Sequence, residues 1–179
     1  MIILIVGKQN SGKSLFAEEL AAGSGTDRHY YLATMKVCDE AGRERVIRHR
    51  KQREGKGFIT IELQYGINRA VQMMEEPENS VVLLECIANL VGNEMYDNPE
   101  RAWAEGKKEE RYAAIDEDEF AETVMKDIKL LSDNVKELVI VSDEYDTGGV
   151  KDEETRKYIR LLSLMNKRLA EYADKVYVH

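Results

Sequence analysis

Short aliphatic runs alternate with stretches of helical spacing along the chain. The first run, Met1 to Val6, is branched-aliphatic and ends at a glycine, which is typical of a strand buried on both faces of a parallel sheet. The residues from Ser14 to Ala22 then place apolar positions at helical spacing, and two glycines end this pattern. A buried strand followed directly by a helix predicts βαβ-type connections.

Five further segments have the composition of strands, and polar or helical sequence separates each from the next. They are His29 to Ala33, Phe58 to Leu63, Ser80 to Leu84, Leu138 to Ser142 and Lys175 to Val178. Apolar residues at three- and four-residue spacing predict crossover or covering helices over Tyr65 to Glu75, Glu119 to Asp133 and Asp152 to Tyr172. We therefore predict an α/β fold with a mostly parallel, doubly wound sheet flanked by helices.

Length and composition favour one domain over residues 1–179. A chain of 179 residues is too short for two well-cored domains, and no Pro/Ser-rich linker interrupts it. The longest apolar run, at the N-terminus, is far shorter than the roughly 20 residues of a membrane helix. No basic segment precedes this run, so we expect a cytoplasmic protein without a membrane span. Cys38 and Cys86 fit reduced thiols and show no zinc spacing.

The net charge argues against one class of partner. Acidic residues outnumber basic ones by 34 to 26, which gives a net charge of -8 and disfavours general attraction to nucleic acid or anionic membranes. Any anion site must therefore be local. The stretch from Asp97 to Glu119 is highly charged and weakly periodic, so we expect an exposed helical excursion or a mobile segment that Trp103 could dock.

The segment from Gly7 to Ser14, GKQNSGKS, matches the pattern G-x-x-x-x-G-K-[ST]. It lies between a strand pattern and a helix pattern, where backbone N–H groups and a helix N-terminus converge on one anion. Gly7 and Gly12 let the backbone wrap phosphates, Lys13 faces the β/γ oxygens, and Ser14 can ligate Mg²⁺. The alternative is a glycine-rich turn that binds nothing. The predicted phosphate-binding residues are Gly7, Lys8, Gln9, Asn10, Ser11, Gly12, Lys13 and Ser14.

A P-loop enzyme usually needs an acidic residue at the carboxyl end of a neighbouring strand to hold Mg²⁺. Glu85 follows the aliphatic run Val81 to Leu84 and is the candidate to act with Ser14. Asp143 and Glu144 end another aliphatic strand pattern and offer a second acidic position. For each position the alternative is a strand end in solvent.

The segment from Arg43 to Lys56 gathers seven basic residues around one histidine. Such a cluster can be a solvated helix face or a crude nucleic-acid patch. The functional interpretation is a triphosphate site, because guanidinium groups bind phosphate oxygens and nearby cations depress the pKa of a histidine. His49 would then keep an unprotonated nitrogen and act as a nucleophile. His29 and His179 lack such surroundings.

Together, the P-loop, the LLEC strand end and the R-x-x-x-H-R-x-x-R cluster resemble the bifunctional adenosylcobinamide kinase / adenosylcobinamide-phosphate guanylyltransferase family of cobalamin biosynthesis. The likeness runs nearly end to end, through YYLAT (Tyr30 to Thr34), ITIE (Ile59 to Glu62) and MNKRLAEYADKVYV (Met165 to Val178). The order and spacing of the blocks carry it, because other P-loop kinases lack a histidine block between the second and third strands followed by an aliphatic-Glu-Cys strand end.

The resemblance implies a RecA-like P-loop domain, commonly a homo-oligomer, that acts on a corrinoid substrate with ATP or GTP and Mg²⁺. It implies first a transfer of the γ-phosphoryl group to the aminopropanol hydroxyl of adenosylcobinamide. A second reaction then attaches GMP from GTP to that phosphate and releases pyrophosphate. His49 falls on the family's guanylylated histidine. The positions expected around the guanine nucleotide are Thr34, Met35, Lys36, Arg50, Lys51, Gln52, Arg53, Glu62 and Glu85.

Two other functions stay open. A kinase for another small hydroxylated metabolite would keep Lys13 and Glu85 and use His49 only as a phosphate contact. A nucleotide-binding regulatory module without catalysis is suggested by the turn from Asp143 to Lys151, which lacks a proline and a glycine of the family pattern. RNA binding by the basic cluster is disfavoured, because no aromatic residues interleave its cations.

Overall fold

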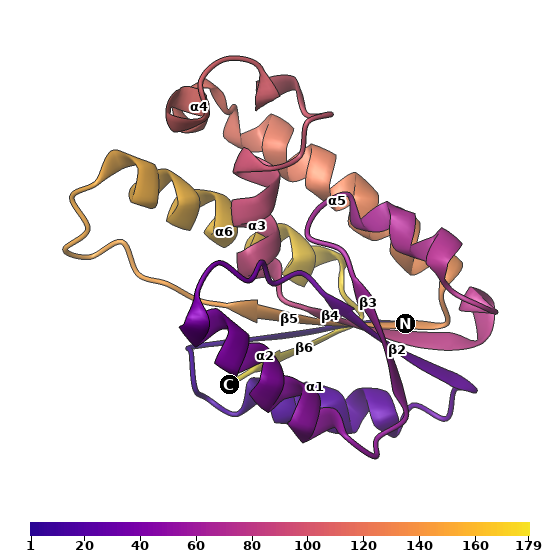
Figure 1. The fold of residues 1–179 in the computed structure, drawn as a ribbon. Helices are drawn as coiled ribbons and strands as arrows, with labels where there is room; N and C mark the ends of the chain where they lie inside the picture. Colours follow the sequence, from indigo (N-terminus) through magenta and orange to yellow (C-terminus); the bar gives the residue numbers. More distant parts are fainter.

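A parallel sheet of six strands forms the centre of the molecule in the computed structural model, which describes all 179 residues (Figure 1). The strands are β1 (Ile2–Gly7), β2 (Arg28–Ala33), β3 (Phe58–Glu62), β4 (Ser80–Glu85), β5 (Glu137–Asp143) and β6 (Lys175–Val178). They pair in the order β3-β2-β4-β5-β1-β6, and every pair is parallel. All six predicted strands and the α/β class are confirmed.

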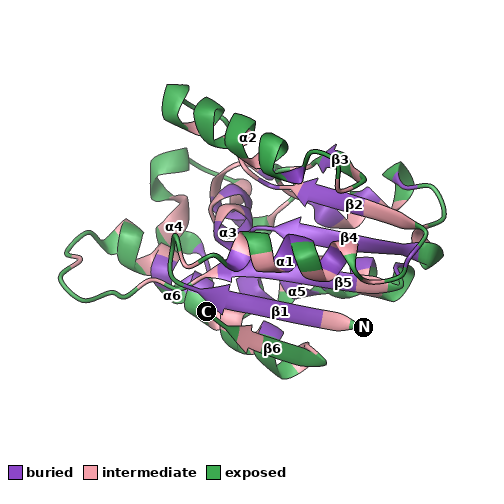
Figure 2. Ribbon diagram, turned by 90° about the horizontal axis from the view of Figure 1, so that it is seen from below, coloured by how far each residue is buried: buried purple, intermediate pink, exposed green.

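Helices cover both faces of the sheet. Figure 1 shows α1 (Lys13–Ala22) and α2 (Glu40–Arg53) on one face, and α3 (Ile87–Tyr96), α5 (Glu117–Asn134) and α6 (Glu153–Tyr172) on the other. The central strands β1, β4 and β5 are buried between these layers, as their aliphatic runs predict (Figure 2). The edge strand β6 is mostly exposed.

The helical elements differ in part from the predicted ones. The structure adds α2, whose only buried residue is Arg53, and α3, which is buried over most of its length. α2 lacks the one-sided apolar stripe by which a sequence reveals a surface helix. α3 does carry apolar residues at helical spacing, with Ile87, Leu90 and Val91 buried, and it was not among the predicted helices. The helix predicted over Tyr65 to Glu75 is a 3₁₀ helix at Ile67–Met73, in which Ile67 and Ala70 are buried. Residues three apart face the same side in a 3₁₀ helix, so this spacing fits it as well as an α-helix.

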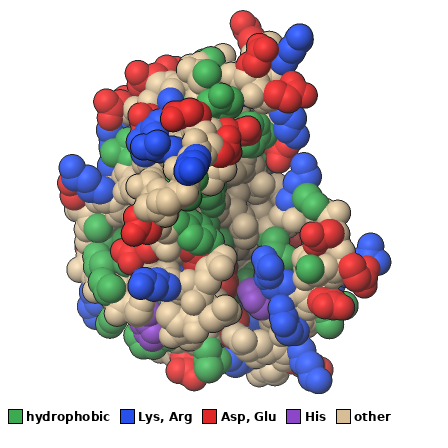
Figure 3. All heavy atoms as spheres, turned by 90° about the vertical axis from the view of Figure 1, so that its left-hand side faces the viewer, with side chains coloured by type: hydrophobic (Ala, Val, Ile, Leu, Met, Phe, Trp, Pro, Cys, Tyr) green, Lys and Arg blue, Asp and Glu red, His purple; other side chains and the backbone are tan.

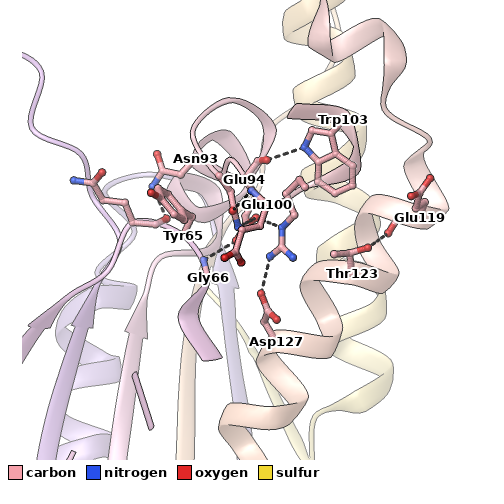
Figure 4. Close-up of polar contacts among 12 residues, drawn as sticks. Tyr65, Gly66, Asn93, Glu94, Glu100, Trp103, Glu119, Thr123 and Asp127 are labelled. Atoms are coloured by element: carbon pink, nitrogen blue, oxygen red, sulfur yellow. Dashed lines mark hydrogen bonds and ion pairs between the residues drawn. The ribbon is translucent and has the colours of Figure 1, made fainter. Parts of the chain in front are cut away.

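The highly charged segment after α3 is folded against the body of the molecule. Trp103 is 6% exposed, and its Nε1 donates a hydrogen bond of 2.9 Å to the Glu94 carbonyl oxygen (Figure 4). The expected docking by Trp103 is therefore confirmed. The charged segment itself forms only short helical turns before α5. They are the 3₁₀ turns Ala102–Ala104 and Lys108–Glu110 and the short helix α4 (Arg111–Ala114).

A buried ionic network secures this docked segment. Glu94 is 1% exposed and accepts hydrogen bonds from Arg101 Nε at 2.6 Å and from the Gly66 amide at 2.9 Å. Arg101 also pairs with Asp127 of α5 at 2.6 Å, and Figure 4 shows Asp127 below this centre. Because a buried charge must be paired and hydrogen-bonded, the network fixes α3, α5 and the loop before the 3₁₀ helix relative to one another.

Three strand ends meet where β5 runs between β1 and β4. Gly7 at the end of β1 is opposite Asp143, and Glu85 at the end of β4 is opposite Val141. The carboxyl ends of parallel strands lie at one edge of a sheet, and ligands of open α/β folds bind there. The predicted phosphate-binding loop and both acidic strand ends therefore share one edge.

Candidate functional site

The loop after β1 leads directly into α1 and places the Lys13 ammonium beside the end of β5. Gly12 has a φ of 85°, the left-handed conformation that favours glycine. Lys13, the first residue of α1, is 6% exposed, and its Nζ donates to the Lys8 carbonyl oxygen at 2.9 Å. The same Nζ forms a 2.5 Å ion pair with Asp143. The predicted phosphate-binding lysine is therefore held by a carboxylate in this structure.

Gly7 has a packing role in addition to its place in the loop motif. A Cβ atom at this position would lie 2.4 Å from the backbone oxygen of His179, which follows β6. The His179 amide also donates to the Val6 carbonyl oxygen at 2.8 Å. Any side chain at Gly7 would therefore push β6 away from β1.

Ser14 and Glu85, the predicted metal pair, are in direct contact. Ser14 Oγ donates a hydrogen bond to one carboxylate oxygen of Glu85, and the Tyr31 phenol donates to the other at 3.0 Å. Burial, and then the charge of Glu85, raise the pKa of Tyr31 far above its usual range, so the phenol stays protonated. A hydroxyl and a carboxylate beside a phosphate loop are oxygen ligands of the kind that Mg²⁺ takes.

The helix that carries His49 is fixed at its C-terminal end by Arg53. This arginine is 7% exposed, and its guanidinium carbon lies 3.4 Å from the centroid of the Tyr31 ring. Its buried Nη1 has no hydrogen-bond partner in the protein. A buried donor of a charged group is costly to leave unpaired, so this nitrogen marks a place where an anion would be stabilised.

Glu18 of α1 also holds the C-terminal end of α2 in place. Its side chain is 1% exposed and accepts hydrogen bonds from Gln52 at 3.0 Å and from Lys56 at 3.1 Å. At its other end α2 is capped by Asp39, whose carboxylate accepts from the Gly42 amide at 2.7 Å. Since most of α2 is exposed, these contacts and the Arg53 stack position the helix above the sheet edge.

The P-loop and the basic cluster around His49 line the same cavity, which has a volume of about 760 Å³. This volume is typical of small-molecule sites. Figure 3 shows this face of the molecule, hollowed between a column of Lys and Arg side chains and the main body. His49 of α2 and the P-loop residues Lys13 and Ser14 all line it. The predicted site residues in its wall are Gln9, Asn10, Lys13, Ser14, Met35, His49, Arg50, Arg53, Glu62 and Glu85.

The other predicted site residues lie outside the cavity wall. Thr34 is fully buried, and its hydroxyl bonds to the backbone oxygen and amide of Cys86 at 2.9 and 2.8 Å. Lys36 pairs with Asp97 at 3.4 Å, and Gln52 is directed to Glu18. The remaining ones are Gly7, Lys8, Ser11, Gly12 and Lys51.

Sequence reasoning did not identify the cavity wall that faces away from α2. Tyr145, which follows β5, accepts a 2.7 Å hydrogen bond from Gln9 Nε2 and lies 3.4 Å from the Asp143 carboxylate. Tyr158 of α6 also lines the cavity and donates to the Ala88 carbonyl oxygen at 2.8 Å. The only sequence signal was an aromatic residue close to the acidic end of a strand.

The arrangement of loop, sheet and acidic strand end defines an α/β protein of the P-loop NTPase fold class. Residues 3–179 match the family model described as "CobU: Cobinamide kinase / cobinamide phosphate guanyltransferase", and the chain belongs to this family. The resemblance inferred from the sequence motifs is thereby confirmed. None of the helices combines the length and the apolar character that crossing a bilayer requires.

A curated relative agrees with this family assignment. The chain is 28% identical over 179 residues to the bifunctional adenosylcobalamin biosynthesis protein CobU of Escherichia coli K12, covering 99% of this chain and 94% of that protein. Among solved structures, the flagellar accessory protein FlaH of Methanocaldococcus jannaschii is 16% identical, with a TM-score of 0.39. That match covers 90% of this chain and 67% of the other.

Proposed function

We propose that this protein phosphorylates adenosylcobinamide with ATP or GTP and then transfers GMP from GTP to the resulting phosphate through a guanylylated His49. The observation that carries the proposal is that His49 and the P-loop side chains Lys13 and Ser14 line one cavity. Family membership supports the two activities. The shared cavity supports a mechanism in which the P-loop and His49 act on nucleotide and corrinoid bound at one site.

In the kinase step, the P-loop amides and Lys13 bind the β- and γ-phosphates of the nucleotide. Lys13 exchanges its ion pair with Asp143 for the phosphate oxygens. Ser14 and Glu85 are the residues that would hold Mg²⁺, which neutralises developing phosphate charge when bound. The acceptor hydroxyl oxygen forms a bond to the γ-phosphorus while the bond to the β-γ bridging oxygen breaks. The hydroxyl proton goes to the transferred phosphoryl group.

In the guanylyl step, an imidazole nitrogen of His49 attacks the α-phosphorus of GTP. A P–N bond forms, the bond to the α-β bridging oxygen breaks, and pyrophosphate leaves. Arg50 and Arg53, which follow His49 in α2, line the same cavity and supply cationic donors to the phosphate oxygens. The unpartnered Nη1 of Arg53 then gains an acceptor. A phosphate oxygen of the corrinoid product finally displaces His49 and takes the GMP.

The two alternative functions account for less of the geometry. A kinase for a different small alcohol needs the P-loop and Glu85 but gives no role to a histidine among cations in the same cavity. A regulatory module explains nucleotide binding but not the direct contact of Ser14 with Glu85, which suits a catalytic metal.

The decisive experiment is incubation of the protein with GTP, Mg²⁺ and adenosylcobinamide, followed by mass analysis of the corrinoid. We expect adenosylcobinamide-GDP. Phosphorylated corrinoid without attached GMP would contradict the guanylyl transfer and leave only the kinase step. An unchanged corrinoid would refute the whole proposal.

A matched pair of lysine variants tests the origin of the activity. Lys13→Ala removes the ammonium aimed at the phosphates, and we expect it to abolish corrinoid phosphorylation. Lys126→Ala is the control, because Lys126 is an exposed lysine of α5 outside the cavity, and it should keep the parental activity. Equal activity of both variants would contradict the P-loop assignment.

A further inference from the structure

The cavity has two chemically different ends. At one end α2 contributes Arg45, Arg48, His49, Arg50 and Arg53, which form a cationic wall. The opposite end, which we call the neutral wall, holds no Lys or Arg side chain. It consists of Cys86, Ala88, Asn89, Tyr145 and Tyr158.

The position of the phosphate loop decides which end faces the reacting phosphoryl group. Lys13 pairs with Asp143, and Ser14 contacts Glu85, so the γ-phosphate site lies at the ends of β4 and β5. Cys86 follows Glu85 directly, and Tyr145 lies 3.4 Å from Asp143. The neutral wall therefore begins where the γ-phosphate ends, on the side away from the cationic wall.

The polar groups of the neutral wall remain uncharged at physiological pH. Burial, and then the charge of Asp143, raise the pKa of Tyr145 to about 12. Burial also raises the pKa of Tyr158, whose ring centroid lies 6.5 Å from that of Tyr145. Such a surface offers hydroxyl and amide hydrogen bonds and aromatic faces, and no ionic attraction.

Tyr145 is positioned by the phosphate loop, by the end of β5 and by α6. Gln9 of the loop donates to the Tyr145 hydroxyl at 2.7 Å, and this hydroxyl in turn donates to the Asp143 carboxylate at 3.4 Å. Asn166 of α6 accepts from Ser142 Oγ at 2.5 Å and donates to the Asp143 backbone oxygen at 3.0 Å, so the chain leading to Tyr145 is fixed. The Tyr145 hydroxyl is thus placed beside the phosphoryl group before an acceptor arrives.

We propose that the neutral wall is the acceptor subsite, in which Tyr145 and Asn89 bind an uncharged amide-linked amino-alcohol arm and aim its hydroxyl at the γ-phosphorus. This inference rests on the proposed function and names the residues that recognise its acceptor. An uncharged arm gains nothing from the cationic wall, whereas the hydroxyl and amide groups of the neutral wall match its hydrogen-bonding groups. In-line transfer also requires the acceptor oxygen to approach beyond the γ-phosphate, which is where this wall lies.

The test is steady-state phosphorylation of adenosylcobinamide at saturating ATP and Mg²⁺ by Tyr145→Val and Asn89→Ala. We expect each variant to raise the KM for the corrinoid by about 3- to 10-fold, as the loss of one or two hydrogen bonds predicts. The KM for ATP and the covalent labelling by GTP should stay at parental values. Tyr65→Val is the control, because Tyr65 is a half-buried tyrosine outside the cavity.

The outcomes separate this inference from the proposed function. An unchanged corrinoid KM in both variants, beside an active parent, would overturn the acceptor subsite alone. An equal rise in the KM for ATP would also overturn it, because the wall would then belong to the nucleotide. A parent that does not modify adenosylcobinamide would overturn the proposed function, and the subsite with it.

Discussion

The ion pair between Lys13 and Asp143 predicts that one substitution weakens the nucleotide-free protein and strengthens nucleotide binding. The two side chains are 7% and 13% exposed, and the pair is 2.5 Å long. Breaking a buried pair costs about 3 to 5 kcal/mol. Asp143→Asn keeps an oxygen that can accept from Lys13, and such a bond recovers about 1.5 kcal/mol or more. We therefore expect the free energy of unfolding to fall by about 2 kcal/mol.

We expect Asp143→Asn to bind nucleotide more tightly than the parent by the same free energy that it loses in stability. Lys13 must leave Asp143 to reach the phosphates, so the parent loses the ion pair on binding and the variant has little to lose. A difference of about 2 kcal/mol corresponds to a roughly 30-fold tighter dissociation constant for ATP. The affinity is to be measured by calorimetry in the presence of EDTA, so that metal coordination plays no part. Stability is to be measured by urea unfolding of the nucleotide-free protein.

Glu144→Gln is the matched control for this prediction. Glu144 is the next residue, is exposed and takes part in no ion pair, so its loss removes one negative charge without freeing Lys13. We expect it to leave both quantities nearly unchanged. Equal effects of the two variants would show that general charge is responsible. Weaker ATP binding by Asp143→Asn would refute the competition between the carboxylate and the phosphates.

Two further substitutions test the buried contacts around the site. Tyr31→Phe keeps the ring beneath α2 but removes the hydrogen bond to Glu85, so the free energy of unfolding should fall by about 1.5 kcal/mol in urea titrations; an unchanged value would show that this bond contributes nothing. Glu94→Gln leaves Arg101 with one carboxylate fewer in a buried network and should cost about 3 kcal/mol. The exposed Glu100→Gln serves as its control, and a loss of the same size there would contradict the network's role.

Local pattern predicted the sheet well, because each buried strand is aliphatic over its whole length. The P-loop was also evident, since its spacing is contiguous and Glu85 ends an apolar run. The pairing of Lys13 with Asp143 could not be predicted, because it depends on β5 lying between β1 and β4. α2 escaped prediction as a helix because its only buried residue is an arginine.

Long-range contacts also decided which predicted residues face the cavity. The sequence predicted that all residues from Arg50 to Arg53 lie around the nucleotide. In the helix, however, Gln52 points to Glu18 and Arg53 stacks on the Tyr31 ring. Thr34 directly precedes Met35, which lines the cavity, but the Thr34 hydroxyl forms hydrogen bonds with the backbone of Cys86 instead. The oligomeric state stays a prediction from the family resemblance.

The central claim is that His49 carries GMP, and covalent labelling tests it most directly. GTP labelled at the α-phosphate should leave label on the denatured protein in an acid-labile, alkali-stable form, as a P–N bond requires. GTP labelled at the γ-phosphate should leave none. His49→Ala should lose the label and still phosphorylate adenosylcobinamide, whereas the control His179→Ala should keep it. Full labelling of His49→Ala, or no labelling of the parent, would contradict the account.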